Sequence, residues 1–307
     1  MKKITIPLVV QRWAYIIGAV IFILLMIIFC AYGVSEAKEK SDLSPSFLGI
    51  YQKAMRFYPE ILKYSKKYDV DPTLILSIAM YESGGNENLT SDAGAKGLMQ
   101  VMPATKKDME IYGTDVSANI EAGVKYLKFV KEEMMEYYGE ISGPYLKMLM
   151  IQSYHDGPER AKRPTLRRVS FQYLQGVSIF FNLLSCEKDK IEELAKDIKI
   201  LVLEKPQTWK ELAKKFNLSV IELRLSNPFL AGFYSGEIPK GEAIAYPNEC
   251  SHPVIDGLYV SRRGDILRYI SNVFDISCSE LRERTNLLMW SPFYPETIID
   301  VSDSPYL

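Results

Sequence analysis

The strongest indication of the fold is the segment Asp71-Pro-Thr-Leu-Ile-Leu-Ser-Ile-Ala-Met-Tyr-Glu-Ser-Gly-Gly85. Asp71 suits a helix N-cap, Pro72 suits the first helical position, and Gly84 is typical of a helix end. The residues between are almost all apolar, which predicts a buried helix with one carboxyl group, Glu82, in its last turn. Partial burial and the negative end of the helix dipole both disfavour a charged carboxylate, so we expect a raised pKa for Glu82.

A carboxylic acid with a raised pKa stays protonated near neutral pH and can act as a general acid. Position alone does not require that role for Glu82, because an exposed glutamate at a helix end is an ordinary surface feature. The choice between the two interpretations depends on the segments around this helix.

The neighbouring sequence is patterned mainly as helices. Apolar residues at helical spacing predict a helix over residues 59–68, a second through 120–134, and a third from 144 to 154. Strand signals are scarce in this part of the chain. We therefore expect a mainly α domain over residues 47–190.

The C-terminal part changes style and contains two similar segments. Each has a serine three residues before a glutamate, a capping box that starts a helix, and each is flanked by short extended runs. The serine–glutamate pairs are Ser219 with Glu222 and Ser277 with Glu280. The pattern predicts two small βααβ modules, over residues 198–249 and 256–303, and so an α+β multidomain protein.

The N-terminus contains an almost unbroken apolar run over residues 14–34. A helix of that length spans the hydrocarbon core of a membrane, which is about 30 Å thick. Lys2, Lys3 and Arg12 precede the run, so the positive-inside rule places the N-terminus in the cytoplasm and the rest of the chain outside.

Residues 1–35 are therefore predicted to be a transmembrane anchor in the cytoplasmic (inner) membrane, followed by a linker over residues 36–46. The domains beyond the linker would lie in the periplasm or cell-wall space. A signal peptide cleaved near Ser35-Glu-Ala37 is one alternative, and a lipoprotein attached through Cys30 is another.

Composition excludes several other classes of protein. A net charge of −1 over 307 residues offers no basic excess for nucleic acid. Four separated cysteines and two histidines form no metal-ligand cluster, so we expect neither a metal nor a cofactor.

Four segments resemble the soluble lytic transglycosylase family in order and spacing. They are Met80-Tyr-Glu-Ser-Gly-Gly85, Gly94-Ala-Lys-Gly-Leu-Met-Gln-Val-Met-Pro-Ala-Thr105, Asn119-Ile-Glu-Ala-Gly-Val-Lys-Tyr-Leu127 and Gln152-Ser-Tyr-His-Asp-Gly-Pro158. In the last segment, Ser153 and His155 replace the alanine and asparagine of the family. The resemblance covers roughly residues 51–185 and implies a lysozyme-like fold.

The resemblance also implies a reaction. The family cleaves the MurNAc–GlcNAc β-1,4 bond of peptidoglycan without water and forms a 1,6-anhydro-MurNAc end, with one glutamate as both acid and base. Glu82 matches that glutamate, and its motif contains no second carboxylate, although Asp92 or Asp156 could fold in. By the same carry-over, six residues are expected to bind substrate, with the Tyr154 hydroxyl aimed at Glu82. They are Ser83, Gly97, Met99, Gln100, Tyr154 and His155.

The two C-terminal modules resemble LysM modules, which bind GlcNAc-containing glycans. The better match is Leu258-Tyr-Val-Ser-Arg-Arg-Gly-Asp-Ile-Leu267. We therefore expect a membrane-tethered lytic transglycosylase that acts on peptidoglycan strands and carries a glycan-binding tail. A lysozyme-type muramidase on the same fold, with water as nucleophile, and a non-catalytic wall-binding protein are the alternatives. We expect the basic run over residues 160–168 to be a solvated face.

Overall fold

The computed structural model describes residues 43–307 except 164, 231–235, 249–253 and 288–293. The predicted anchor over residues 14–34 and Cys30 lie outside the described residues. Within the part of the chain that is described, we find no helix that is both long and apolar enough to cross a membrane.

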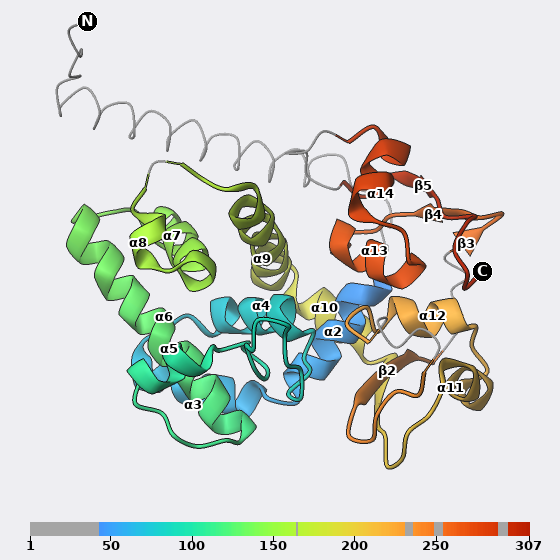
Figure 1. The fold of residues 1–307 in the computed structure, drawn as a ribbon, viewed down its shortest axis with the longest axis horizontal. Coiled ribbons are helices and arrows are strands. Elements are labelled where there is room, and N and C mark those ends of the chain that lie inside the picture. The colour runs from blue at the N-terminus through green and yellow to red at the C-terminus, as the bar shows by residue number, and fades with distance from the viewer. Residues whose placement is uncertain (1–42, 164, 231–235, 249–253, 288–293) are drawn as a thin grey trace, which may run out of the picture.

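The first half of the described chain is helical (Figure 1). Its helices are α2 (Pro45–Met55), α3 (Tyr58–Tyr68), α4 (Pro72–Ser83), α5 (Pro103–Asp108), α6 (Val116–Tyr138), α7 (Gly143–Asp156), α8 (Pro158–Ala161), α9 (Arg168–Cys186) and α10 (Lys188–Ala195). The helices predicted from apolar spacing are confirmed as α3, α6 and α7. This region is therefore mainly helical, as its sequence predicts.

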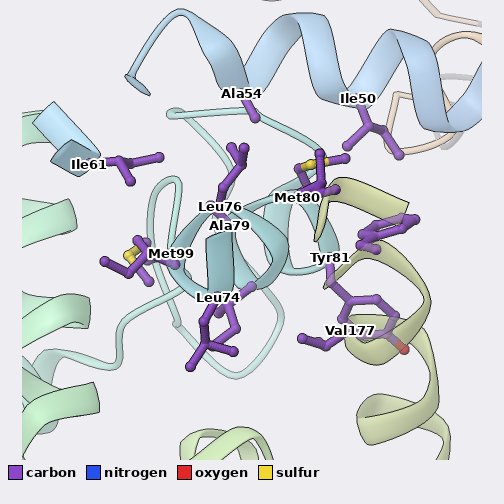
Figure 2. Close-up of a cluster of buried hydrophobic side chains, with 14 of the residues drawn as sticks. Ile50, Ala54, Ile61, Leu74, Leu76, Ala79, Met80, Tyr81, Met99 and Val177 are labelled. Atoms are coloured by element: carbon purple, nitrogen blue, oxygen red, sulfur yellow. The ribbon is translucent and has the colours of Figure 1, made fainter. Parts of the chain in front are cut away.

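Helix α4 is the centre of the main hydrophobic core. The Asp71 carboxylate accepts the Thr73 N–H and caps the start of the helix, and Gly84 ends it in the left-handed conformation with φ 62°. Side chains of α4 point outward on all sides into neighbouring elements, as Leu74, Leu76 and Ala79 do in Figure 2. Burial all round explains why the sequence of this helix is apolar without a polar face.

Each C-terminal segment forms the predicted strand–helix–helix–strand unit. In the first, β1 (Ile198–Val202) pairs antiparallel with β2 (Ala243–Pro247) across α11 (Trp209–Phe216) and α12 (Val220–Leu225). In the second, β4 (Leu258–Val260) pairs antiparallel with β5 (Ile298–Asp300) across α13 (Leu267–Phe274) and α14 (Cys278–Thr285), and β3 (Val254–Ile255) adds a further strand.

The predicted caps start these helices, but they differ in detail. Ser219 and Glu222 form a reciprocal capping box at α12. Ser277 accepts the backbone N–H of Glu280 at the start of α14, which is half of such a box. Trp209, the first residue of α11, is buried in the core of the first module.

Both modules pack against the helical domain, and α12 of the first module also contacts α13 of the second (Figure 1). A Cβ placed on Gly49 of α2 would lie 2.2 Å from the carbonyl oxygen of Ser226, so only glycine allows this approach. In the second module the buried Asp265 accepts hydrogen bonds from Ser44, at 2.5 Å, and Tyr259, at 2.6 Å. The modules and the helical domain therefore form one packed body rather than a domain with a loose tail.

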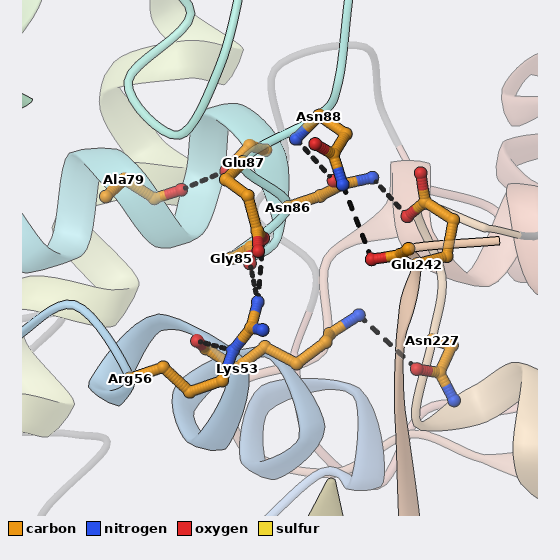
Figure 3. Close-up of polar contacts among 11 residues, drawn as sticks. Lys53, Arg56, Ala79, Gly85, Asn86, Glu87, Asn88, Asn227 and Glu242 are labelled. Atoms are coloured by element: carbon orange, nitrogen blue, oxygen red, sulfur yellow. Dashed lines mark hydrogen bonds and ion pairs between the residues drawn. The ribbon is translucent and has the colours of Figure 1, made fainter. Parts of the chain in front are cut away.

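A polar cluster lies at the contact between α2, the end of α4 and the first module (Figure 3). Lys53 donates to Oδ1 of Asn227 at 3.3 Å, and Asn86 donates to the Glu242 carboxylate at 2.8 Å. Lys53 is only 1% exposed, and burial lowers the pKa of its ammonium group to about 7. The interface thus contains a lysine that titrates near neutral pH instead of at alkaline pH.

Candidate active site

Glu82 occupies the last turn of α4 and keeps only part of its surface open to solvent. Burial raises the pKa of its carboxyl group to about 7, against the opposing influence of a hydrogen bond from Tyr173 and the charge of Arg268. The raised pKa expected from the sequence is therefore present, and desolvation is its main cause. Near neutral pH the group can both give and take a proton.

Tyr173 on α9 donates its hydroxyl to Oε1 of Glu82 at 2.7 Å. Burial and the neighbouring carboxylate raise the pKa of Tyr173 well above its usual range, so the hydroxyl remains a donor. Sequence reasoning missed this residue, because it lies at helical spacing among buried apolar neighbours and resembles an ordinary core aromatic.

The second and third motifs pack closely against each other. Gly97 has φ 75°, and a Cβ there would lie 2.7 Å from the Asn119 side chain. Asn119 in turn accepts the Met99 N–H at 2.9 Å and donates to the Lys96 carbonyl at 2.8 Å. A Cβ on Gly123 would lie 2.7 Å from the Met99 sulfur. These glycines therefore let the loop over residues 94–101 press against α6.

The fourth motif contacts this loop instead of Glu82. The sequence predicts a Tyr154 hydroxyl aimed at Glu82. In the structure, Tyr154 on α7 instead donates its hydroxyl to the Met99 carbonyl at 2.8 Å. The carbonyl is a fixed acceptor on a buried turn, and Tyr173 already supplies the donor to the carboxylate. Glu82 nevertheless lies near enough to raise the pKa of Tyr154, after the larger effect of burial.

The other expected substrate-binding residues divide into buried and accessible ones. Ser83 and Met99 are fully buried, and the Ser83 hydroxyl donates to the Ala79 carbonyl at 3.2 Å. Gln100 is partly exposed, has φ 47°, and donates its amide to the carbonyls of Leu89 and Gly97. Ser83 and Met99 thus expose no surface in this structure, whereas Gln100 remains partly exposed, and their expected contacts with substrate stay predictions.

His155 lies beside Tyr173, with ring centroids 4.5 Å apart, and its Nδ1 is 2.9 Å from the Asp156 carboxylate. Asp156 also accepts from Arg167, a member of the basic run, and its side chain is fully buried. Burial raises the pKa of Asp156, but bonds from Ser170, His155 and Arg167 outweigh it and the pKa is lowered. Asp156 is therefore an ionised structural group, and Asp92 lies exposed in a loop.

The backbone just before Glu82 is held by the second C-terminal module. Arg268 on α13 donates to the Tyr81 carbonyl at 2.9 Å, and its guanidinium group lies 4.6 Å from the centroid of the Tyr81 ring. That ring sits in a notch on α9, where a Cβ on Gly176 would be 2.1 Å from it. No sequence signal pointed to Arg268. Within the described residues, no group of three or more His, Cys, Asp or Glu side chains could hold a metal ion.

Comparison with known proteins agrees with this geometry. Residues 59–173 match the family described as Transglycosylase SLT domain. Over 109 residues the chain is 34% identical to a transglycosylase of Enterobacteria phage PRD1, a match covering 35% of this chain and 37% of that protein. It is also 34% identical over 118 residues to membrane-bound lytic murein transglycosylase C of Actinobacillus pleuropneumoniae, covering 34% of this chain and 32% of the relative.

Residues 59–173 therefore form a lysozyme-like domain of the transglycosylase SLT type. The matched region spans about a third of the length of these relatives. Among solved structures, lytic transglycosylase Slt of Pseudomonas aeruginosa, an inactive mutant, superimposes with a TM-score of 0.34 and 22% identity, over 43% of this chain and 24% of that one.

Proposed function

We propose that this protein is a peptidoglycan lytic transglycosylase in which Glu82 is the catalytic acid and base. The observation that carries the proposal is the state of Glu82, a partly buried carboxyl group with a pKa of about 7 and a hydrogen bond from Tyr173. A group at that pKa can donate a proton in one step and accept one in the next. The SLT domain match and the lytic transglycosylase relatives support the same activity.

The reaction follows from these two protonation states. Protonated Glu82 gives its proton to the oxygen that joins MurNAc C1 to GlcNAc C4, and the bond from C1 to that oxygen breaks. The Glu82 carboxylate then takes the proton of the MurNAc C6 hydroxyl, and O6 bonds to C1. The products are a GlcNAc hydroxyl end and a 1,6-anhydro-MurNAc end, and Glu82 regains its proton without any water being consumed.

The structural surroundings of Glu82 suit a mechanism with one carboxyl group. The opposing influences on its pKa come from the Tyr173 hydroxyl and the Arg268 guanidinium, and neither Asp92 nor Asp156 is among them. Two-carboxylate glycosidases hold their second group within about 10 Å of the first. Asp156 is occupied by His155 and Arg167, so it is poorly placed to activate water.

The C-terminal modules are proposed to be LysM-like glycan-binding units, supported by their antiparallel βααβ arrangement and by the resemblance at residues 258–267. The apolar stretch over residues 14–34 is proposed to tether the enzyme to the membrane, with the described domains in the cell-wall space. Glycan strands would then be held near Glu82 by the same body that carries it.

The deciding experiment is mass spectrometry of fragments released from purified sacculi by the full chain in detergent. We expect fragments that end in 1,6-anhydro-MurNAc, one water lighter than reducing ends. Glu82→Gln should release none and still bind sacculi, and Glu283→Gln, at an exposed position on α14, should behave as wild type. Hydrated reducing ends would instead identify a muramidase, and cleavage by Glu82→Gln would refute the site.

A further inference from the structure

Both C-terminal modules meet the helical domain at the last turn of α4. From the first module, the Phe229 ring packs on Gly84, where a Cβ would come within 2.2 Å of it. From the second module, Arg268 and Tyr269 both direct donors at the Tyr81 carbonyl, at 2.9 and 3.5 Å. Glu82 and Ser83 lie between Tyr81 and Gly84, so these contacts hold the backbone on both sides of the proposed catalytic group.

The Tyr81 carbonyl belongs to the last turn of a helix, where carbonyl groups lack partners within the helix and carry partial negative charge. A cation that donates there satisfies an acceptor and complements the dipole. Arg268 does so with its Nη2 atom, while its guanidinium group is held over the rings of Tyr81, Phe229 and Tyr269 at 4.6, 5.5 and 5.4 Å. Three rings and a hydrogen bond define its position, although the residue itself is solvent-exposed.

We infer that Arg268, supplied by the second C-terminal module, is a positioning residue for Glu82: by holding the Tyr81 carbonyl it fixes the end of α4 and places a positive charge beside the carboxyl group. The link of this inference to catalysis rests on the proposed function. The contact between Arg268 and the end of α4 does not depend on that function. The second module is then part of the catalytic apparatus in addition to any role in binding glycan.

Electrostatics gives the direction in which Arg268 changes the pKa of Glu82. The charge of Arg268 lowers the pKa of Glu82, in opposition to burial. Removing the charge would raise the pKa of Glu82, which keeps it protonated to higher pH and makes it a weaker acid toward the glycosidic oxygen. Loss of the hydrogen bond would also loosen the Tyr81 backbone. The charge effect and the hydrogen-bond effect can be separated, because a lysine at this position keeps the positive charge but lacks the planar guanidinium group that donates to the Tyr81 carbonyl.

The test compares Arg268→Gln and Arg268→Lys in the full chain with Arg284→Gln as control. Arg284 is on the same module and pairs with Glu280 and Asp303. Hydrogen exchange followed by mass spectrometry measures the exchange rate of the backbone amides over residues 80–86. Digestion of sacculi gives kcat, KM and the pH profile of cleavage. Exchange needs no activity, so a wild-type enzyme that fails to cleave would refute the proposed function and leave the positioning role measurable.

For Arg268→Gln we expect roughly tenfold faster exchange over residues 80–86, kcat roughly tenfold lower with KM within about twofold, and an alkaline limb moved to higher pH. Arg268→Lys should keep the wild-type alkaline limb but lose part of kcat. If Arg268→Gln does not fold, the lysine variant decides. Wild-type exchange and kcat in a folded variant would overturn the inference, and so would a change confined to KM, which would make Arg268 a substrate contact.

Discussion

The hydroxyl of Tyr173 on α9 donates a hydrogen bond to Oε1 of Glu82 on α4, across 2.7 Å. This bond works against the burial of Glu82, because it favours the charged carboxylate whereas burial favours the neutral acid. It also fixes the orientation of the carboxyl group, since α9 packs along α4. This contact between two helices therefore orients the carboxyl group and offsets part of the pKa increase that burial causes.

Tyr173→Phe removes that donor and should raise the pKa of Glu82 above its present value of about 7. We expect the alkaline limb of the sacculus-cleavage profile to move to higher pH and the maximal rate to fall by about tenfold or more, the usual worth of a hydrogen bond to a charged group. Tyr138→Phe, whose hydroxyl contacts the Ala161 carbonyl in a separate cluster, is the control. An unchanged pH profile would refute this account of Glu82.

Glu82→Gln should stabilise the protein at alkaline pH. The pKa of Glu82 is raised from 4.5 to about 7 in the folded state, so the stabilisation from its protonation is complete below pH 4.5 and is lost as pH rises to 7. Above pH 7 the buried charge costs on the order of 1–3 kcal/mol. Urea unfolding at pH 5 and pH 8 measures this, and the gain should appear chiefly at pH 8. A variant no more stable than wild type at pH 8 would contradict it.

Lys53→Met should increase stability most at acidic pH. The pKa of Lys53 falls from 10.5 to about 7 on folding, so between these values only the unfolded chain holds the proton and wild-type stability rises with pH. Below pH 7 the folded protein bears a buried charge costing a few kcal/mol, on the order estimated for such shifts. Asn227 keeps the Ala245 N–H as donor in the variant.

Urea unfolding at pH 6 and pH 9 tests the Lys53 prediction, with the exposed Lys210→Met as control. The gain from Lys53→Met should shrink between the two pH values and that of the control should not. An equal gain at both would show that packing, and not charge, limits this interface.

Gly97→Ala should destabilise the protein more than Gly94→Ala. Both glycines have positive φ, 75° and 87°, so each alanine pays a backbone cost of about 1 kcal/mol. Only Gly97 has a neighbour, the Asn119 side chain, within 2.7 Å of a new Cβ, whereas Gly94 faces open space. We expect a further loss of about 1–3 kcal/mol at Gly97, measured by thermal unfolding. Equal losses would mean that the loop and α6 do not interlock.

Gly49→Ala should separate the first module from α2. Its Cβ would lie 2.2 Å from the Ser226 carbonyl, which is backbone and cannot turn aside. Gly143→Ala, at the first residue of α7 with open space around it, should be neutral or stabilising by up to about 1 kcal/mol. We expect increased proteolysis between β1 and β2 for Gly49→Ala alone. Resistance equal to wild type would argue that the module does not pack here in solution.

The parts of the fold that could be predicted from sequence are those that depend on interactions between residues close together in the chain. The cap at Asp71, the stop at Gly84 and the apolar run between them predict α4 to within a residue, because each acts over one turn of chain. The serine–glutamate pairs and their flanking runs likewise predict the βααβ order of the modules. The resemblance of four short motifs pointed to Glu82, and burial of its helix gave the direction of its pKa.

Local sequence signals were sufficient to predict which segments are helices and strands and which carboxyl group lies at the end of the buried helix. The groups that contact this carboxyl group depend on tertiary packing. Tyr173 is 91 residues from Glu82, and Arg268 is 187 residues from Tyr81, so neither contact leaves a periodic signal in the chain. Tyr154 was assigned to the wrong acceptor for the same reason. Hydrogen bonds between distant elements depend on how helices pack, and packing is settled by the whole core at once.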